Sequence, residues 1–234
     1  MTTPETLVIL QARTGSSRLP GKVLSRIGDR SILAHCVGRL LAAGVGDVVV
    51  ATTGAPQDNA VVEEARRCGV RATRGPEHDV LARFIEALPS AEPRVVVRAT
   101  ADNPAVDIGA PARVVSLLRT IGADYVVEPD LPCGAAVEAV TVAALRTAHR
   151  LAVTPADREH VTPFIRRHRA RFRNVLVAAP VTIRRLDLRL TVDTAGDLEY
   201  MRRVFAAAEA TVEPVPLTAL IAAADRIAAA EVVA

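Results

Sequence analysis

Leu7-Val-Ile-Leu-Gln-Ala-Arg-Thr-Gly-Ser-Ser-Arg-Leu-Pro-Gly-Lys-Val-Leu24 is the stretch that decides the fold. Its first residues, Leu7 to Leu10, form an apolar run that is typical of a buried strand. The loop that follows combines cations, hydroxyls, glycine and proline, at Arg13, Gly15, Ser16, Ser17, Arg18, Pro20, Gly21 and Lys22. Glycine lets backbone N–H groups approach a ligand, and cations just beyond a strand suit a polyphosphate. A solvated basic turn is the plainer alternative, but strand, glycines and cations together predict a phosphate-binding loop.

Strand and helix patterns alternate along the rest of the chain. Buried strands are predicted at 47–53, 70–73, 94–101, 124–127, 174–183 and 188–192, and helices at 32–43, 57–68, 107–120, 140–150 and 217–229, with a further helix beginning near Thr194. This alternation indicates an α/β protein with a doubly wound, mostly parallel sheet, in which ligands bind beyond the carboxyl ends of the strands. The loop matches neither G-x-G-x-x-G nor the Walker pattern, which disfavours an ordinary dinucleotide fold and a P-loop NTPase.

Composition narrows the function classes. A chain of 234 residues that is 50% hydrophobic fits a single domain, 1–234. Aromatic residues make up 3% and the net charge is only +3, so neither stacking on single strands nor nucleic-acid binding is expected. The three cysteines show no C-x-x-C spacing, no signal peptide opens the chain, and no apolar run has the length of a membrane span. We therefore expect a cytoplasmic protein that binds a small anionic molecule.

One acidic residue follows a predicted strand close to the phosphate loop in the expected fold. The strand that begins at Arg94 delivers Asp102 to its carboxyl end. Mg²⁺ takes one or two carboxylates together with phosphate oxygens, so Asp102 is a candidate metal ligand, with a helix cap as the alternative. Asp193 ends the 188–192 run and is open to the same capping interpretation, for which Thr194 and Asp197 compete.

The 7–24 stretch resembles the opening loop of the cytidylyltransferases. It is most similar to the branch of spore-coat polysaccharide biosynthesis proteins, which is related to CMP-Kdo and CMP-acylneuraminate synthetases. The resemblance implies a Rossmann-like fold of the nucleotide-diphospho-sugar transferase type, a loop that wraps the triphosphate of CTP, and Mg²⁺ as cofactor. It also implies that Asp193 is the second metal carboxylate, beside Asp102. On this basis the residues expected to be catalytic are Arg13, Arg18, Lys22, Asp102 and Asp193.

The same resemblance extends to the nucleotide base. Arg74-Gly-Pro-Glu-His-Asp-Val-Leu-Ala-Arg83 is similar to the family segment R-G-x-x-x-D-V-L-x-R, which lies along base and ribose. From the residues alone, Asp79 is equally consistent with a helix N-terminus. The residues expected to bind nucleotide are Gln11, Ala12, Arg13, Gly15, Ser16, Ser17, Lys22, Thr52, Thr53, Arg74, Gly75, Asp79 and Arg83.

The segments expected to border the acceptor depart from the family pattern. Ala101 replaces the glycine of G-D-C-P, and in Leu131-Pro-Cys-Gly-Ala-Ala-Val-Glu138 two residues, Cys133 and Ala136, stand where aspartates are usual. Glu138 matches, and the segment Asp157-Arg-Glu-His-Val-Thr-Pro-Phe-Ile165 resembles R-E-H-V-T-P-Y-I. We therefore expect Glu138, Glu159 and His160 to contact the acceptor, although a histidine on an amphipathic helix is more often structural.

These observations predict a CTP-dependent cytidylyltransferase that attaches CMP to a small anionic acceptor and releases pyrophosphate. The acceptor is a phosphonate, a phosphate or a sugar acid, because loss of two carboxylates favours an anion and a phosphonate oxygen needs no general base. A glycosyltransferase that uses a nucleotide sugar is the alternative, but the chain lacks a D-x-D motif at Asp124 or Glu128. A non-catalytic nucleotide-binding module is a third hypothesis. A homodimer is left open.

Overall fold

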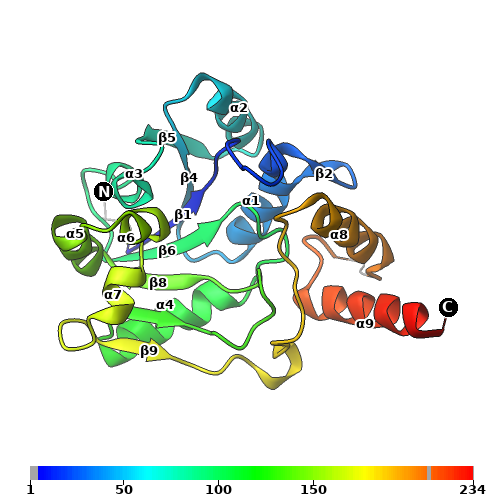
Figure 1. Cartoon of the computed structure of the whole chain (residues 1–234). Helices are drawn as coiled ribbons and strands as arrows, with labels where there is room; N and C mark the ends of the chain where they lie inside the picture. Colours follow the sequence, from blue (N-terminus) through cyan, green and yellow to red (C-terminus); the bar gives the residue numbers. More distant parts are fainter. Residues whose placement is uncertain (1–4, 210–211, 234) are drawn as a thin grey trace.

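The structure is a computed structural model that describes residues 5–209 and 212–233 (Figure 1). Its seven-stranded sheet has the order β5-β4-β1-β6-β8-β7-β9. The strands are β1 (Thr6–Gln11), β4 (Asp47–Thr53), β5 (Arg71–Gly75), β6 (Val95–Thr100), β7 (Tyr125–Val127), β8 (Glu138–Thr141) and β9 (Asn174–Leu176). All neighbours pair in parallel except β8, which is antiparallel to β6 and β7. A mostly parallel, doubly wound α/β sheet is therefore confirmed.

Helices cover both faces of this sheet. One face carries α1 (Ile32–Ala42), α2 (Asn59–Arg67) and α4 (Ala110–Ile121), joined by α8 (Ala195–Ala207) and α9 (Leu217–Val233). The other face carries α3 (Val80–Glu86), α5 (Val142–Leu151), α6 (Pro155–His160) and α7 (Pro163–Arg167). A small hairpin, β2 (Arg26–Ile27) with β3 (Arg30–Ser31), and three short 3₁₀ turns complete the fold, at Lys22–Leu24, Pro56–Asp58 and Val181–Ile183. None of the helices in the described ranges is both long and apolar enough to cross a bilayer.

Strand alternation divides the core into two layers. Val8 and Leu10 of β1 pack toward α1 and α4, whereas Leu7 and Ile9 pack toward α3 and α5. Successive side chains of a strand point to opposite faces, so a strand buried on both sides is a continuous apolar run. This is why the apolar run at the start of the chain forms the central strand of the sheet.

Many of the predicted boundaries are confirmed. The strand predicted at 47–53 is β4, and the helix after Ser31 is α1, whose N-cap hydroxyl accepts the Ala34 N–H at 3.0 Å. Thr194 and Asp197 form a capping box at the start of α8. Burial of the apolar face of each element, together with these caps, accounts for the agreement.

Three predicted elements are wrong in part. The helix predicted at 140–150 begins later, because Val140 belongs to β8 and the Thr141 hydroxyl caps α5. Of 174–183 only Asn174–Leu176 is a strand, and Val181–Ile183 is a 3₁₀ turn. Residues 188–192 form no strand, because their backbone hydrogen-bonds to Cys133 and to the Asp102 carbonyl instead of to a full neighbouring strand. Ala101 raises no backbone conflict, since the one non-glycine residue with positive φ in the described part of the chain is Val161.

Candidate active site

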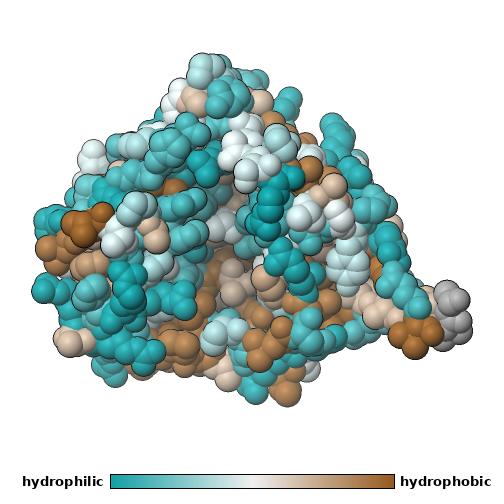
Figure 2. All heavy atoms as spheres, in the orientation of Figure 1, coloured by the Kyte–Doolittle hydropathy of each residue, from teal (hydrophilic) through white to brown (hydrophobic). Residues whose placement is uncertain are grey.

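A cavity of about 360 Å³ opens beyond the carboxyl ends of β1 and β6. This volume lies in the range of small-molecule sites, and the position is the one that a doubly wound sheet favours. Figure 2 shows the face of the molecule that Figure 1 presents, with a hollow near its centre. The cavity is lined by Gln11, Ala12, Arg13, Gly15, Ser16, Ser17, Arg18, Lys22, Val23, Val80, Arg83, Arg98, Thr100, Ala101, Asp102, Glu159, His160 and Asp193.

The loop after β1 is held in shape by a residue that sequence reasoning missed. Asp58, in the turn before α2, accepts hydrogen bonds from the Thr14 N–H and the Thr14 hydroxyl, both at 2.7 Å, and from the Thr53 hydroxyl. Burial raises the pKa of Asp58, but these hydrogen bonds outweigh it and leave the pKa below its ordinary value. The Thr14 carbonyl in turn accepts the N–H of Gly21, which has φ 71°. Asp58 therefore fixes the loop from outside it.

Lys22 lies between the two carboxylates that were predicted to bind metal. Its Nζ is 3.0 Å from Asp102 Oδ2 and 2.9 Å from Asp193 Oδ1, and it donates to the Val192 carbonyl at 2.7 Å. The two aspartates come from distant parts of the chain, yet they converge on one ammonium group. The structure therefore brings the two carboxylates together around Lys22, and their metal role remains a prediction.

Asp193 is surrounded by positive charge. Arg18 lies 3.0 Å from its Oδ1, and Arg189 donates to its Oδ2 at 2.6 Å. Burial raises the pKa of Asp193, but the bonds from Lys22 and Arg189 and the charges of Lys22 and Arg18 outweigh it and hold the pKa at about 2. Asp193 is thus ionised at any physiological pH.

The chemistry of this donor set fits a hard divalent cation that arrives with phosphate. Mg²⁺ usually keeps several waters and takes one or two protein carboxylates plus substrate phosphates. Asp102 and Asp193 supply two carboxylates, and the cations of the loop stand beside them. Within the described ranges, no group of three or more acidic, histidine or cysteine side chains forms a self-sufficient metal cage. The site therefore suits a metal that is completed by nucleotide oxygens.

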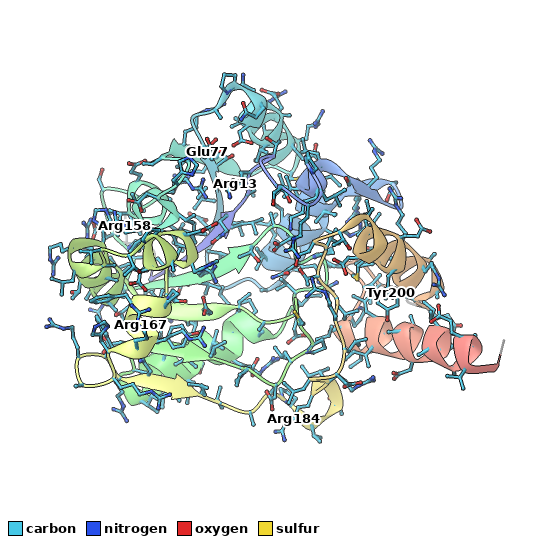
Figure 3. The ribbon with its side chains drawn as sticks, in the orientation of Figure 1. Arg13, Glu77, Arg158, Arg167, Arg184 and Tyr200 are labelled. Atoms are coloured by element: carbon cyan, nitrogen blue, oxygen red, sulfur yellow. The ribbon has the colours of Figure 1, made fainter. Side chains whose placement is uncertain are left out.

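Two further arginines face the cavity beside the loop. Arg13 is 3.8 Å from Glu77 and 3.8 Å from Glu159, and Figure 3 shows Arg13 and Glu77 next to each other. Arg83 of α3 is buried, and its burial, aided by the charge of Arg13, lowers its pKa. The two guanidinium groups line the same cavity as Lys22 and Asp102 and add positive charge to it.

Several residues predicted to bind nucleotide lie behind the cavity or beside it. Thr52 and Thr53 are buried in β4, and the Thr53 hydroxyl is engaged by Asp58. Asp79 caps α3 by accepting the Ala82 N–H at 2.8 Å, and it also pairs with Arg158 of α6. Arg74 donates to the Thr53 carbonyl at 3.1 Å and to Asn59, and the Gly75 carbonyl accepts the Gly54 N–H. None of these five residues lines the cavity. In this structure they support the loops and helices around it.

The expected acceptor residues separate into two groups. Glu159 and His160 are exposed and line the cavity. This position favours contact with a ligand over a purely structural role for His160. Behind His160, Val161 has φ 71° and ψ −55°, a strained conformation that ends α6 and directs Thr162 toward Glu138. Glu138 is outside the cavity lining and hydrogen-bonds to Arg98, Tyr125 and Thr162. Arg98 itself lines the cavity and was missed from the sequence.

Comparison with known proteins agrees with this fold. The sequence profile of the cytidylyltransferase family matches residues 7–215. The spore coat polysaccharide biosynthesis protein SpsF of Bacillus subtilis is 34% identical over 85% of this chain and 85% of its own length. An uncharacterised Methanocaldococcus jannaschii protein, MJ1063, is 40% identical over 82% of this chain and 79% of its own length.

Solved structures share the same architecture. A cytidylyltransferase from Leptospira borgpetersenii superposes with a TM-score of 0.88 at 26% identity, over 96% of this chain and 95% of that one. A CMP:2-keto-3-deoxy-manno-octonic acid synthetase complexed with CTP has a TM-score of 0.64 at 21% identity, over 86% of this chain and 98% of that one. The profile and the relatives cover nearly all of the elements that build the cavity.

Proposed function

Since this chain belongs to the cytidylyltransferase family and is a nucleotidyltransferase, we propose that it transfers CMP from CTP to a small acidic acceptor. The observation that carries the proposal is the convergence of two cations, Lys22 and Arg18, and two carboxylates, Asp102 and Asp193, beside the loop that follows β1. The relative complexed with CTP supports the choice of nucleotide.

In the proposed reaction an oxygen of the acceptor attacks the α-phosphorus of CTP. A new P–O bond forms to the acceptor, the bond between the α-phosphorus and the bridging oxygen breaks, and pyrophosphate leaves with its electron pair. Arg13, Arg18 and Lys22 bind and neutralise the triphosphate, and the loop backbone orients it. Asp102 and Asp193 would hold a divalent cation, Mg²⁺, which when bound neutralises charge on phosphate oxygens. A manganese complex of a structural neighbour is consistent with a divalent metal.

The acceptor is a small acid in this proposal. The cavity presents Arg13, Arg18, Lys22, Arg83 and Arg98 against three carboxylates, those of Asp102, Asp193 and Glu159. A cavity with more cations than anions favours anionic ligands, of which the triphosphate is one. The synthetase among the structural neighbours is named for a keto sugar acid, which supports this class.

Pyrophosphate release tests the proposal directly. The protein is incubated with each of the four nucleoside triphosphates, Mg²⁺, and a panel of acceptors that contains a sugar acid, a phosphonate, a sugar phosphate and a neutral sugar. We expect release with CTP and one of the acidic acceptors. Absence of CTP binding by calorimetry would refute the nucleotide assignment, and turnover restricted to the neutral sugar would refute the acidic acceptor.

A further inference from the structure

Arg98 occupies an unusual position for a charged residue. It lies in β6, between β1 and β8, and pairs in register with Ile9 on one side and Glu138 on the other. Its neighbours Val97 and Ala99 point to the opposite face, into the core that α1 and α4 cover. Arginine is almost never buried in a central strand without a specific partner or task. Two residues further on, Thr100 pairs in register with Gln11, and all three of these polar side chains line the cavity.

The guanidinium of Arg98 has hydrogen-bonding capacity that the protein leaves unused. Nη1 donates to Glu138 Oε2 at 2.7 Å. Nε is buried without a partner, and Nη2 donates to no group among the residues that the structure describes. The side chain is only 16% exposed, and its Nε is shut off from bulk water, whereas Nη2 is not among the buried atoms and is left for solvent or a ligand. A desolvated cation with unpaired N–H groups is costly unless an anion completes its hydrogen bonds.

Glu138 cannot give Arg98 more than this one bond. Its Oε1 accepts the Tyr125 hydroxyl at 2.5 Å and the Thr162 hydroxyl at 3.0 Å, and its Oε2 accepts Thr162 as well as Arg98. Glu138 is therefore held in place by two other side chains, those of Tyr125 and Thr162, and holds Arg98 in turn. Because Glu138 pairs with Nη1 from outside the cavity lining, the guanidinium keeps an unpaired N–H edge beside the cavity.

From this arrangement we infer that Arg98 is the core of an anion subsite that binds the acid group of the acceptor, a carboxylate or a phosphonate or phosphate group. A planar guanidinium matches either group through two parallel hydrogen bonds. Glu138 positions the guanidinium, and Thr100 and Gln11 border the subsite. The inference rests on the proposed function, because it places the acceptor in the same cavity as CTP.

The test measures binding of two small probes, propionate for the carboxylate class and methylphosphonate for the phosphonate class, with 1,2-propanediol as a neutral probe. Saturation-transfer NMR is recorded on the full chain with CTP and Ca²⁺ present. We expect at least one anionic probe to bind and propanediol not to bind, and the better anion identifies the acid class. In Arg98→Gln the dissociation constant of that probe rises by about tenfold or more, as expected for loss of a charge-assisted hydrogen bond.

Two further variants keep the result interpretable. Arg98→Lys retains a cation opposite Glu138, so it protects the fold, but it lacks the planar fork, and we expect weakened probe binding with an unchanged melting temperature. Arg146→Gln is the matched control, since Arg146 pairs with Glu92 outside the cavity, and probe binding stays native. Native-like probe affinity in Arg98→Gln, or no anionic probe bound to the native protein, overturns the inference. CTP affinity, measured on each variant, tests the proposed function separately.

Discussion

The two ends of the cavity hold their cations in different ways. At the loop end, Lys22 and Arg18 contact Asp102 and Asp193, carboxylates that line the same cavity. At the other end, Arg98 is held by Glu138, which lies behind the wall. The cations of the loop end are thus paired inside the cavity, whereas Arg98 is paired from behind its wall and keeps an unpaired N–H edge.

The difference bears on how each end takes up its ligand. Under the proposed function, a triphosphate bound at the loop end would compete with Asp102 and Asp193 for Lys22, and the two aspartates would then hold the divalent cation. Nucleotide binding would therefore depend on the metal. An acid group that binds Arg98 would not have to displace a carboxylate from the unpaired N–H edge. Its binding would depend only on its charge and on how well it matches the planar guanidinium.

The largest effect is expected from the two aspartates. Asp102→Asn and Asp193→Asn keep the side-chain shape but remove a hard anionic ligand, so pyrophosphate release should fall by roughly a hundredfold or more while the protein stays folded. Turnover is measured with CTP and Mg²⁺, and the fold is checked by melting temperature. EDTA should abolish the native activity. Full activity in both variants, or activity that persists in EDTA, contradicts the two-carboxylate site.

The next effect is on nucleotide binding at Lys22, the only lysine in the sequence. Lys22→Ala removes a charge-assisted contact of roughly 1.5–3 kcal/mol, so CTP affinity should weaken by about tenfold or more. Calorimetry gives the affinity. Because no other lysine is present, ¹³C labelling at the lysine ε-carbon yields one side-chain resonance. This resonance reports whether the Lys22 ammonium group changes its contacts when ligand binds.

That resonance should shift when CTP and Ca²⁺ are added together and should shift less with CTP alone. Arg66→Gln, an exposed arginine of α2 that pairs with Glu63, serves as the charge-matched control with native CTP affinity. An unmoved resonance, or native CTP affinity in a folded Lys22→Ala protein, would show that the loop end does not exchange its partners.

The loop end could be predicted from the sequence, and the Arg98 end could not. Lys22 and its neighbours form a local motif, and Asp102 follows an apolar strand, so both were predicted from a short window. Arg98 sits inside an apolar strand, and its role depends on which face it points to and on its register with β8. The sequence pattern did not predict β8, because Val140 continues the apolar pattern of the helix that follows.

The same distinction explains the fold errors. The strands 47–53 and 94–101 are long apolar runs that any register would bury, so they were predicted well. The 188–192 run ends in a similar apolar pattern, but its backbone makes only two hydrogen bonds with Cys133 and one with Asp102, both far away in the chain. Asp58 was missed because its task, holding Thr14, joins residues that only the folded chain brings together.

The third prediction concerns Asp58, whose hydrogen bonds to Thr14 and Thr53 hold the loop that follows β1. Asp58→Asn weakens the hydrogen bonds to Thr14 and Thr53, and the free energy of unfolding should fall by about 1–3 kcal/mol. The folded pKa of Asp58 is below its ordinary value of 3.8, so its contribution is present above that pH and is lost as the pH falls through the folded pKa. Urea unfolding at pH 7 and near pH 3 should therefore show a smaller difference between native protein and variant at the lower pH. An equal difference at both pH values contradicts the assigned ionisation.

The smallest effect is expected from restoring the family's two acids. Cys133→Asp with Ala136→Asp adds negative charge outside the cavity lining, so KM for an acidic acceptor should rise while CTP affinity stays the same. The rise is limited because Arg189 Nη1 lies 3.6 Å from Cys133 Sγ and would pair with a carboxylate there. We expect no more than about fivefold, the equivalent of ~1 kcal/mol for a partly exposed pair. Cys133→Asn with Ala136→Asn has the same size without charge and controls for packing around the half-buried Ala136. If the Asp pair lowers KM relative to the Asn pair, repulsion of the acceptor is the wrong account of these two positions.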